Sequence, residues 1–170
     1  WEAVALLARA PGIDLERANA REETALMLVA LRGQLALARQ LLDAGAEPNR
    51  PGWTALHYAA ISGNLDLVSL LIERNAYIDA ASPNGTTPLM MAAREKRGEV
   101  AQFLLDEGAD PTPRNTAGLS AADYFERTGA TAMAATTRER ARQFEATYGT
   151  VQSPRRVAPA AGVNASISDM

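Results

Sequence analysis

The sequence has 170 residues and contains no cysteine and a single histidine, His57. The lack of cysteine excludes a disulfide framework, a thiolate nucleophile and every cysteine-ligated zinc or iron–sulfur site. One histidine is too few for a metal site of several imidazoles or for a catalytic pair of histidines. We therefore expect no catalytic residues, no metal site and no cofactor, and we expect that the chain is not an enzyme.

Aromatic residues, lysine and long apolar runs are also scarce. Aromatic residues make up 5% of a chain that is 47% hydrophobic, and Lys96 is the only lysine. Much of the apolar content is alanine, which favours closely packed helices over a thick core. The net charge is −3, whereas a nucleic-acid-binding protein normally carries a basic face. No stretch approaches the roughly 20 apolar residues of a membrane-spanning helix. We therefore expect neither a nucleic-acid partner nor a membrane span.

What the sequence does contain is a repeat. Four similar units begin at hydroxyl residues that lie 30, 33 and 33 residues apart: Thr24, Thr54, Thr87 and Ser120. The first three units then share two aliphatic residues and an alanine at fixed offsets: Leu41, Leu42 and Ala46; Leu71, Ile72 and Ala76; Leu104, Leu105 and Ala109. Self-similarity at such a period is typical of solenoid proteins.

Each unit is predicted to form a turn, a short helix, a second turn and a second helix. A glycine two residues before the start marks a tight loop in three units (Gly52, Gly85, Gly118), and the hydroxyl residue can then cap a helix. A second glycine permits a positive φ where the first helix ends (Gly33, Gly63, Gly129). Lys96 replaces that glycine in the third unit, which predicts a strained turn. Asn75 is expected to take the left-handed conformation after the second helix of its unit.

The segment 52–60, Gly-Trp-Thr-Ala-Leu-His-Tyr-Ala-Ala, followed by Gly63 and Leu71, resembles an ankyrin repeat. The segment 87–93, Thr-Pro-Leu-Met-Met-Ala-Ala, matches the same pattern, and the resemblance covers about residues 20–130. It implies an all-α fold, an ankyrin solenoid of helix-turn-helix units with hairpin or loop tips, capped at the C-terminus.

Two segments of the sequence resemble a narrower group of ankyrin proteins. Residues 51–53 and 76–91 are similar to exported ankyrin proteins of proteobacteria, and the bias toward arginine agrees with a bacterial source. This resemblance, together with a first residue that is not Met, leads us to expect a periplasmic location, with the cytoplasm as the alternative.

The offsets divide the chain into an array with atypical ends. We expect a partial N-terminal unit at residues 1–19 and repeats at about 20–49, 50–79 and 80–111. A degraded capping repeat follows at 112–148, because Thr137 and Arg138 stand where the other units have aliphatic pairs. Its second helix should present Met133, Thr137, Ala141, Phe144 and Tyr148 on one face. The remainder, 149–170, is rich in proline, alanine and serine and is predicted to be a disordered tail.

The resemblance also implies where a partner would bind. In ankyrin repeats His57 orders the tight turn, so we assign it a structural role. The inner face of the first helices and the loop tips form a concave wall that contacts protein partners. Mapped onto this chain, the expected contact residues are Leu28, Arg32, Trp53, Tyr58, Ile61, Met91, Arg94, Leu119, Tyr124 and Arg127. Tryptophan, tyrosine and arginine are the residue types enriched at binding hot spots.

The expected function is therefore non-enzymatic protein–protein interaction through the concave face. Two alternatives remain at this stage: Trp53 and Tyr58 could simply pack against neighbouring loops, or the chain could be a dedicated inhibitor, immunity or accessory factor for one partner enzyme. An exposed apolar patch formed by Trp53, Tyr58 and Met91 would favour binding. The sequence leaves the oligomeric state open and favours a monomer.

Overall fold

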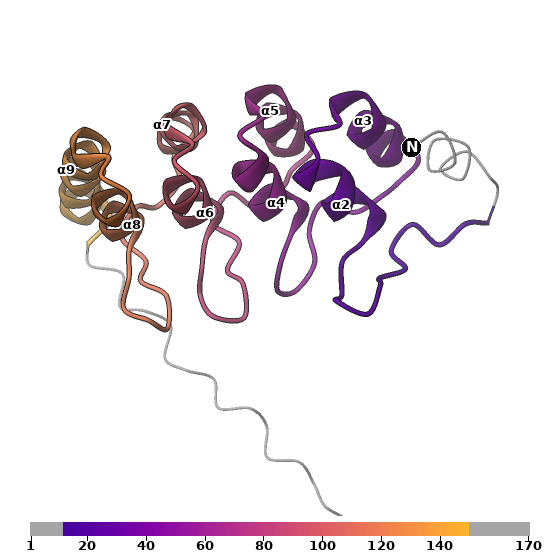
Figure 1. The fold of residues 1–170 in the computed structure, drawn as a ribbon, viewed down its shortest axis with the longest axis horizontal. Helices are drawn as coiled ribbons and strands as arrows, with labels where there is room; N and C mark the ends of the chain where they lie inside the picture. The colour runs from indigo at the N-terminus through magenta and orange to yellow at the C-terminus, as the bar shows by residue number, and fades with distance from the viewer. Residues whose placement is uncertain (1–11, 150–170) are drawn as a thin grey trace, which may run out of the picture.

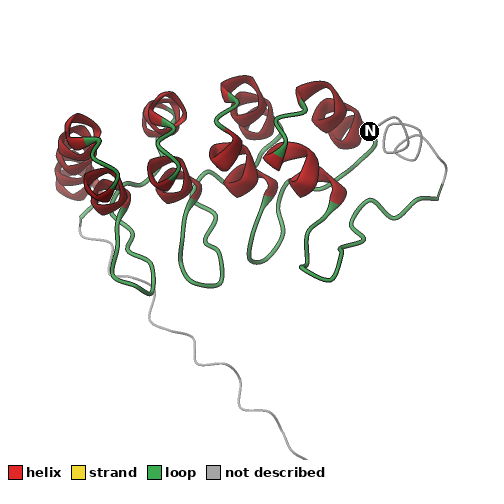
Figure 2. Cartoon of the chain, viewed as in Figure 1, coloured by secondary structure: helices red, strands yellow, loops and turns green. Residues whose placement is uncertain are grey.

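The structure, a computed structural model, describes residues 12–149. Within that part the chain is helical, and no strand is present (Figure 2). The helices in chain order are α2 (Ala25–Leu31), α3 (Leu35–Asp43), α4 (Ala55–Ser62), α5 (Leu65–Glu73), α6 (Pro88–Arg94), α7 (Gly98–Asp106), α8 (Ala121–Arg127) and α9 (Thr131–Tyr148). The predicted all-α solenoid is confirmed.

The helices form two parallel rows. The short helices α2, α4, α6 and α8 make an inner row next to four loops that project away from the array, and α3, α5, α7 and α9 make an outer row (Figure 1). Successive inner helices contact one another, and each inner helix contacts the outer helix of its own unit. We call the four projecting loops, at 19–23, 49–53, 82–86 and 115–119, the loop tips. This arrangement leaves one side of the inner row and the loop tips facing solvent together.

The inner helices begin where the sequence places hydroxyl residues. The side chains of Thr24 and Thr87 accept hydrogen bonds from the N–H groups three residues later, each at 3.4 Å. Ser120 forms a reciprocal capping box, in which its hydroxyl oxygen accepts from the Asp123 N–H at 3.3 Å and its own backbone N–H donates to the Asp123 carboxylate at 2.9 Å. The hydrogen bond from the Ser120 N–H is the main reason that the pKa of Asp123 lies below its usual value. These caps satisfy N–H groups that a helix start leaves without partners.

Within residues 12–149, non-glycine residues take the left-handed conformation at two predicted positions and at one that was not foreseen. Lys96 has φ 58° and Asn75 has φ 63°, so both take the left-handed conformation. Glu22 has φ 61° because it stands in the first loop tip where the later tips have Gly52, Gly85 and Gly118. The fold therefore imposes the same turn on every unit, even where the residue is unsuited to it.

The core runs the length of the array and is thin. The alanines on the inner helices, Ala59, Ala60, Ala92 and Ala93, are all fully buried, as are the leucines Leu67, Leu71 and Leu104 on the outer helices. Alanine at the contact between successive inner helices allows their backbones to approach closely, and leucine fills the space between the two rows. The abundance of alanine thus has a packing reason.

Side chains at one repeated position connect neighbouring units. Glu16, Asn49 and Asp79 each accept a hydrogen bond from the backbone N–H of Glu47, Tyr77 and Asp110 respectively, at 2.8–2.9 Å. Because each acceptor lies 28 to 31 residues before its donor, these bonds join one unit to the next. The array is therefore coupled through both its core and its loops.

The C-terminal cap differs in detail from expectation. Helix α9 extends to Tyr148, close to the predicted end, but its most buried residues are Ala134 and Thr137. Tyr148 is 72% exposed and packs on Phe144, with ring centroids 4.7 Å apart, so it does not join the buried face. The predicted partial unit at 1–19 falls mostly, and the predicted tail at 149–170 almost wholly, outside the described residues.

Candidate protein-binding surface

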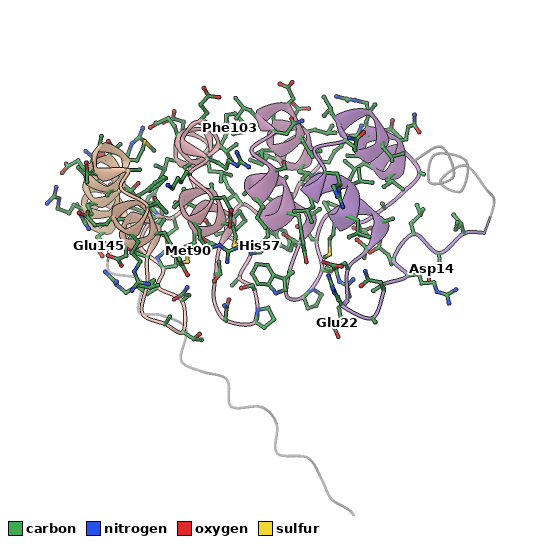
Figure 3. All side chains as sticks on the ribbon, in the orientation of Figure 1. Asp14, Glu22, His57, Met90, Phe103 and Glu145 are labelled. Atoms are coloured by element: carbon green, nitrogen blue, oxygen red, sulfur yellow. The ribbon has the colours of Figure 1, made fainter. Side chains whose placement is uncertain are left out.

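His57 lies in α4 at the base of the second loop tip and is fully buried (Figure 3). Its Nδ1 accepts from the backbone N–H and the hydroxyl of Thr54 at 3.1 and 2.9 Å. Its Nε2 must then carry the hydrogen, which it donates to the carbonyl oxygen of Thr86 in the next unit at 2.9 Å. Both ring nitrogens are thus occupied by structural hydrogen bonds.

The protonation state of His57 follows from this environment. Burial lowers the pKa of His57 below 6.5, and the backbone hydrogen bonds of Thr86 and Ala80 offset this only in part. A second proton on Nδ1 would face the Thr54 N–H, which is also a donor. His57 therefore stays neutral at neutral pH and joins two units, as expected of a structural residue.

Trp53 and Tyr58 form an aromatic cluster between the second loop tip and the inner row. Their ring centroids lie 6.4 Å apart, and the Trp53 ring meets the His57 ring edge-on at 5.1 Å. Both side chains are half-buried, so one part of each packs on the core and another part faces solvent. The alternative that they merely pack against neighbouring residues accounts for only part of each ring.

The hydroxyl of Tyr58 is held in place by the preceding unit. It donates to the Glu23 carboxylate at 3.2 Å across 35 residues of sequence. Burial first, and then the negative charge of Glu23, raise the pKa of Tyr58 above 10.0. Tyr58 therefore reaches solvent as a neutral, oriented phenol.

Tyr124 is fixed in a similar way at the far end of the inner row. Its hydroxyl oxygen accepts from the side-chain amide of Asn115 at 2.9 Å, and Asn115 also accepts the backbone N–H of Leu119 at 3.1 Å. Tyr124 and Leu119 are both half-buried. The fourth loop tip and α8 thus hold two of the expected contact residues in a defined geometry.

One expected contact residue does not face solvent. Met91 is only 2% exposed, so it cannot contact a partner without a change in the structure, and the patch of Trp53, Tyr58 and Met91 does not form. Met91 occupies the same position in α6 as Tyr58 in α4 and Tyr124 in α8. The two larger side chains pack against the same core, and the flexible methionine turns into it.

The other expected residues on or next to the inner helices are at least partly exposed. Leu28 and Ile61 are half-buried, and Arg32, Arg94 and Arg127 are exposed. Arg94 pairs with its neighbour Glu95 at 3.0 Å. We call the group Leu28, Arg32, Trp53, Tyr58, Ile61, Arg94, Leu119, Tyr124 and Arg127 the inner wall.

Comparison with known proteins identifies the fold family. A family model described as ankyrin repeats (3 copies) matches residues 2–82 and 26–115, which together span more than half of the chain. The chain belongs to the ankyrin-repeat family. Ankyrin repeats are generally non-enzymatic modules that bind other proteins.

Curated relatives share this array but are longer. Mouse protein fem-1 homolog A-like is 37% identical over 97 residues, covering 55% of this chain and 15% of that protein. Ankyrin repeat-containing protein P1E11.10 of Schizosaccharomyces pombe is 32% identical over 108 residues, with 61% and 51% coverage. The mouse nuclear factor NF-kappa-B p105 subunit is 36% identical over 111 residues, with 62% and 11% coverage. The chain thus spans about half of the yeast protein and a small part of the other two.

Two kinds of feature are absent from the described part of the chain. Within residues 12–149, no group of three or more histidine, aspartate and glutamate side chains is placed to hold a metal ion. None of the helices in that part is long and apolar enough to cross a bilayer.

Sequence reasoning missed one feature beside the inner wall. A cavity of about 430 Å³ opens between the ends of α2 and α4, and Arg97 from the third unit lines it. Arg97 was overlooked because its neighbours there lie 36 residues away in the sequence, and no local pattern signals such a contact. The only local signal was the irregular turn at Lys96.

Proposed function

We propose that this ankyrin array binds a protein partner non-covalently through the inner wall. The observation that carries the proposal is the pair of half-exposed tyrosines, Tyr58 and Tyr124, whose hydroxyls are fixed by Glu23 and Asn115. A side chain that is already ordered loses little conformational entropy when a partner docks on it. Trp53 and the arginines Arg32 and Arg127 supply further anchors of the types enriched at hot spots.

The test uses affinity capture from the source organism, with the double variant Trp53→Ala/Tyr58→Ala. We expect the wild-type chain to retain a partner and the double variant to lose it, with a midpoint of thermal unfolding within a few degrees of wild type. A matched control is Tyr77→Ala, which removes a tyrosine that is 68% exposed but lies outside the inner wall. Equal capture by the double variant and the wild type would contradict the proposal, and so would unfolding of the variant at ordinary temperature.

The same capture bears on how specific the interaction is. One stoichiometric partner enzyme would favour a dedicated inhibitor, immunity or accessory factor, whereas several partners would favour a general scaffold. We further propose a periplasmic location from the resemblance that the sequence analysis noted at residues 51–53 and 76–91, and fractionation of the source cells would test it.

A further inference from the structure

The cavity of about 430 Å³ lies where the inner helices of two units end. Its lining includes the turn glycines Gly33 and Gly63, the half-buried Leu31 and Ile61, and the guanidinium groups of Arg32 and Arg97. No acidic side chain lines it. Ser62 and Asn64 complete the lining, so the cavity presents two cations on a mostly polar surface with a smaller apolar part from Leu31 and Ile61.

Arg97 is held over the cavity from the third unit. Its Nε–H donates to the carbonyl oxygen of Ile61 at 2.9 Å. A Cβ at Gly63 would lie 2.7 Å from Cδ and 2.9 Å from Nε of Arg97, so the arginine passes directly over that glycine. The absence of a side chain at Gly63 thus makes room for the arginine.

The outer edge of this guanidinium carries donors that the fold does not use. Among residues 12–149, neither Nη of Arg97 donates a hydrogen bond, and no carboxylate lies within ion-pair distance of Arg97 or Arg32. With Nε occupied, the two Nη atoms remain free to bind a carboxylate end-on through parallel hydrogen bonds. Such planar, two-pronged binding is a property of arginine that lysine lacks.

We propose that this cavity binds an acidic side chain from an extended, apolar-flanked segment of the protein partner, with Arg97 as the carboxylate anchor. The carboxylate meets Arg97 end-on, Arg32 adds a second positive charge, and aliphatic neighbours of the acidic residue contact Leu31 and Ile61. The inference deepens the proposed function, because the cavity adjoins Arg32 and Ile61 of the inner wall. The inference requires the partner to carry a negative charge in the segment that enters the cavity.

The test is a titration of the isotope-labelled full chain, followed by NMR of backbone amides and arginine guanidinium groups. The probe is the blocked peptide Ala-Leu-Asp-Leu-Ala, and its matched control is Ala-Leu-Asn-Leu-Ala. We expect the aspartate peptide to shift the signals of Gly33, Gly63 and the Arg97 guanidinium, and to bind about tenfold more tightly than the asparagine peptide. Equal binding of the two peptides, or shifts away from the cavity, would overturn the proposal.

Variants separate the anchor from general charge attraction. Arg97→Gln should weaken the aspartate peptide about tenfold, and Arg97→Lys nearly as much because the two-pronged geometry is lost. Arg39→Gln removes one positive charge from the exposed side of α3 and should leave binding unchanged. An equal loss in Arg39→Gln would contradict the proposal. If Arg97→Gln fails to fold, the pair of peptides on the wild-type chain still decides.

Three further outcomes are distinct. Inorganic phosphate at the same concentration that produces the same shifts would make the cavity a general anion site and overturn the proposal. Loss of partner capture by Trp53→Ala/Tyr58→Ala, with no preference for the aspartate peptide, would reject the carboxylate site and leave the proposed function standing. Capture that survives the double variant would reject the proposed function whatever the peptides do.

Discussion

Asn49 and Asp79 occupy the same position in successive units, yet they differ in what they can donate. Asn49 accepts the Tyr77 N–H at 2.8 Å and donates its amide N–H to the Asn75 carbonyl at 2.7 Å. Asp79 accepts the Asp110 N–H at 2.9 Å, but an ionised carboxylate has nothing to donate. Desolvation, helped by the negative charge of Asp110 and opposed by that hydrogen bond, raises the pKa of Asp79 to about 6.

The variant Asp79→Asn is therefore expected to be more stable than wild type at neutral pH. Because the pKa of Asp79 is raised from 3.8 to about 6 on folding, its contribution to stability is present below pH 3.8 and is lost as the pH rises through about 6. We expect a gain of about 1 kcal/mol in the free energy of unfolding, well below the unscreened value because the residue is exposed to solvent.

Urea denaturation of both proteins across the acidic range measures this difference. The gain should shrink as the pH falls toward 4 and vanish near there. The contribution of His57 to stability changes with pH in the opposite direction, because its lowered pKa means that stability is lost as the pH falls below 6.5. Both proteins contain His57, so this contribution cancels in the difference between them. A gain that does not change with pH would show that the carboxylate is not the cause.

At the scale of the structural element, the turns between inner and outer helices determine how units meet. Gly33 and Gly63 both have positive φ, at 63° and 78°. In both cases the residue that precedes the outer helix of the following unit contacts the glycine. Asn64, before α5, donates to the Gly33 carbonyl at 3.0 Å, and Arg97, before α7, crosses Gly63. The third turn has Lys96 in place of glycine and carries the strain described above.

Gly63→Ala is expected to cost more stability than Gly33→Ala. Both variants place a side chain at a left-handed position, which costs roughly 1–2 kcal/mol. At Gly33 the added Cβ would lie 3.5 Å from its nearest neighbour, which is ordinary contact, whereas at Gly63 it would displace Arg97 and its hydrogen bond to Ile61. We expect about 1 kcal/mol more destabilisation for Gly63→Ala. If both variants lose the same free energy of unfolding in denaturant titrations, Arg97 is not held over Gly63.

At the scale of the whole molecule, each unit buries its apolar face only against its neighbours. Leu71 of α5 is fully buried between the two rows. We expect Leu71→Ala to lower the free energy of unfolding by roughly 2–5 kcal/mol, because truncation leaves a cavity in a thin core. Denaturant unfolding measures this, and Leu65→Ala, on an exposed leucine of the same helix, is the control. A loss no greater than that of Leu65→Ala would contradict the assigned packing.

Local pattern predicted most of the fold because every unit repeats the same signals. The hydroxyl caps at Thr24 and Ser120 and the left-handed turns at Asn75 and Lys96 all depend on residues within a few positions of each other. The repeat offset then transferred each assignment to the other units. Glu22 stands at the offset of Gly52, Gly85 and Gly118, so the comparison of units that indicated Lys96 also indicates its positive φ, although this position was not singled out.

Features that depend on contacts between units were not predictable in this way. Met91 belongs to the core of an array in which α6 contacts both α4 and α8, and the position of Arg97 depends on a carbonyl in another unit. Offsets alone assign Met91 to the inner wall, because they cannot tell a methionine that turns inward from a tyrosine whose hydroxyl is held at the surface.

The most direct test of binding through the inner wall is site-specific photo-crosslinking to the captured partner. A photoreactive amino acid replaces either Arg127, exposed on α8 of the inner row, or Arg39, exposed on α3 of the outer row. The expected result is a crosslinked complex from position 127 and none from position 39. Crosslinking from position 39 alone would contradict the account, because the partner would then lie on the outer helices.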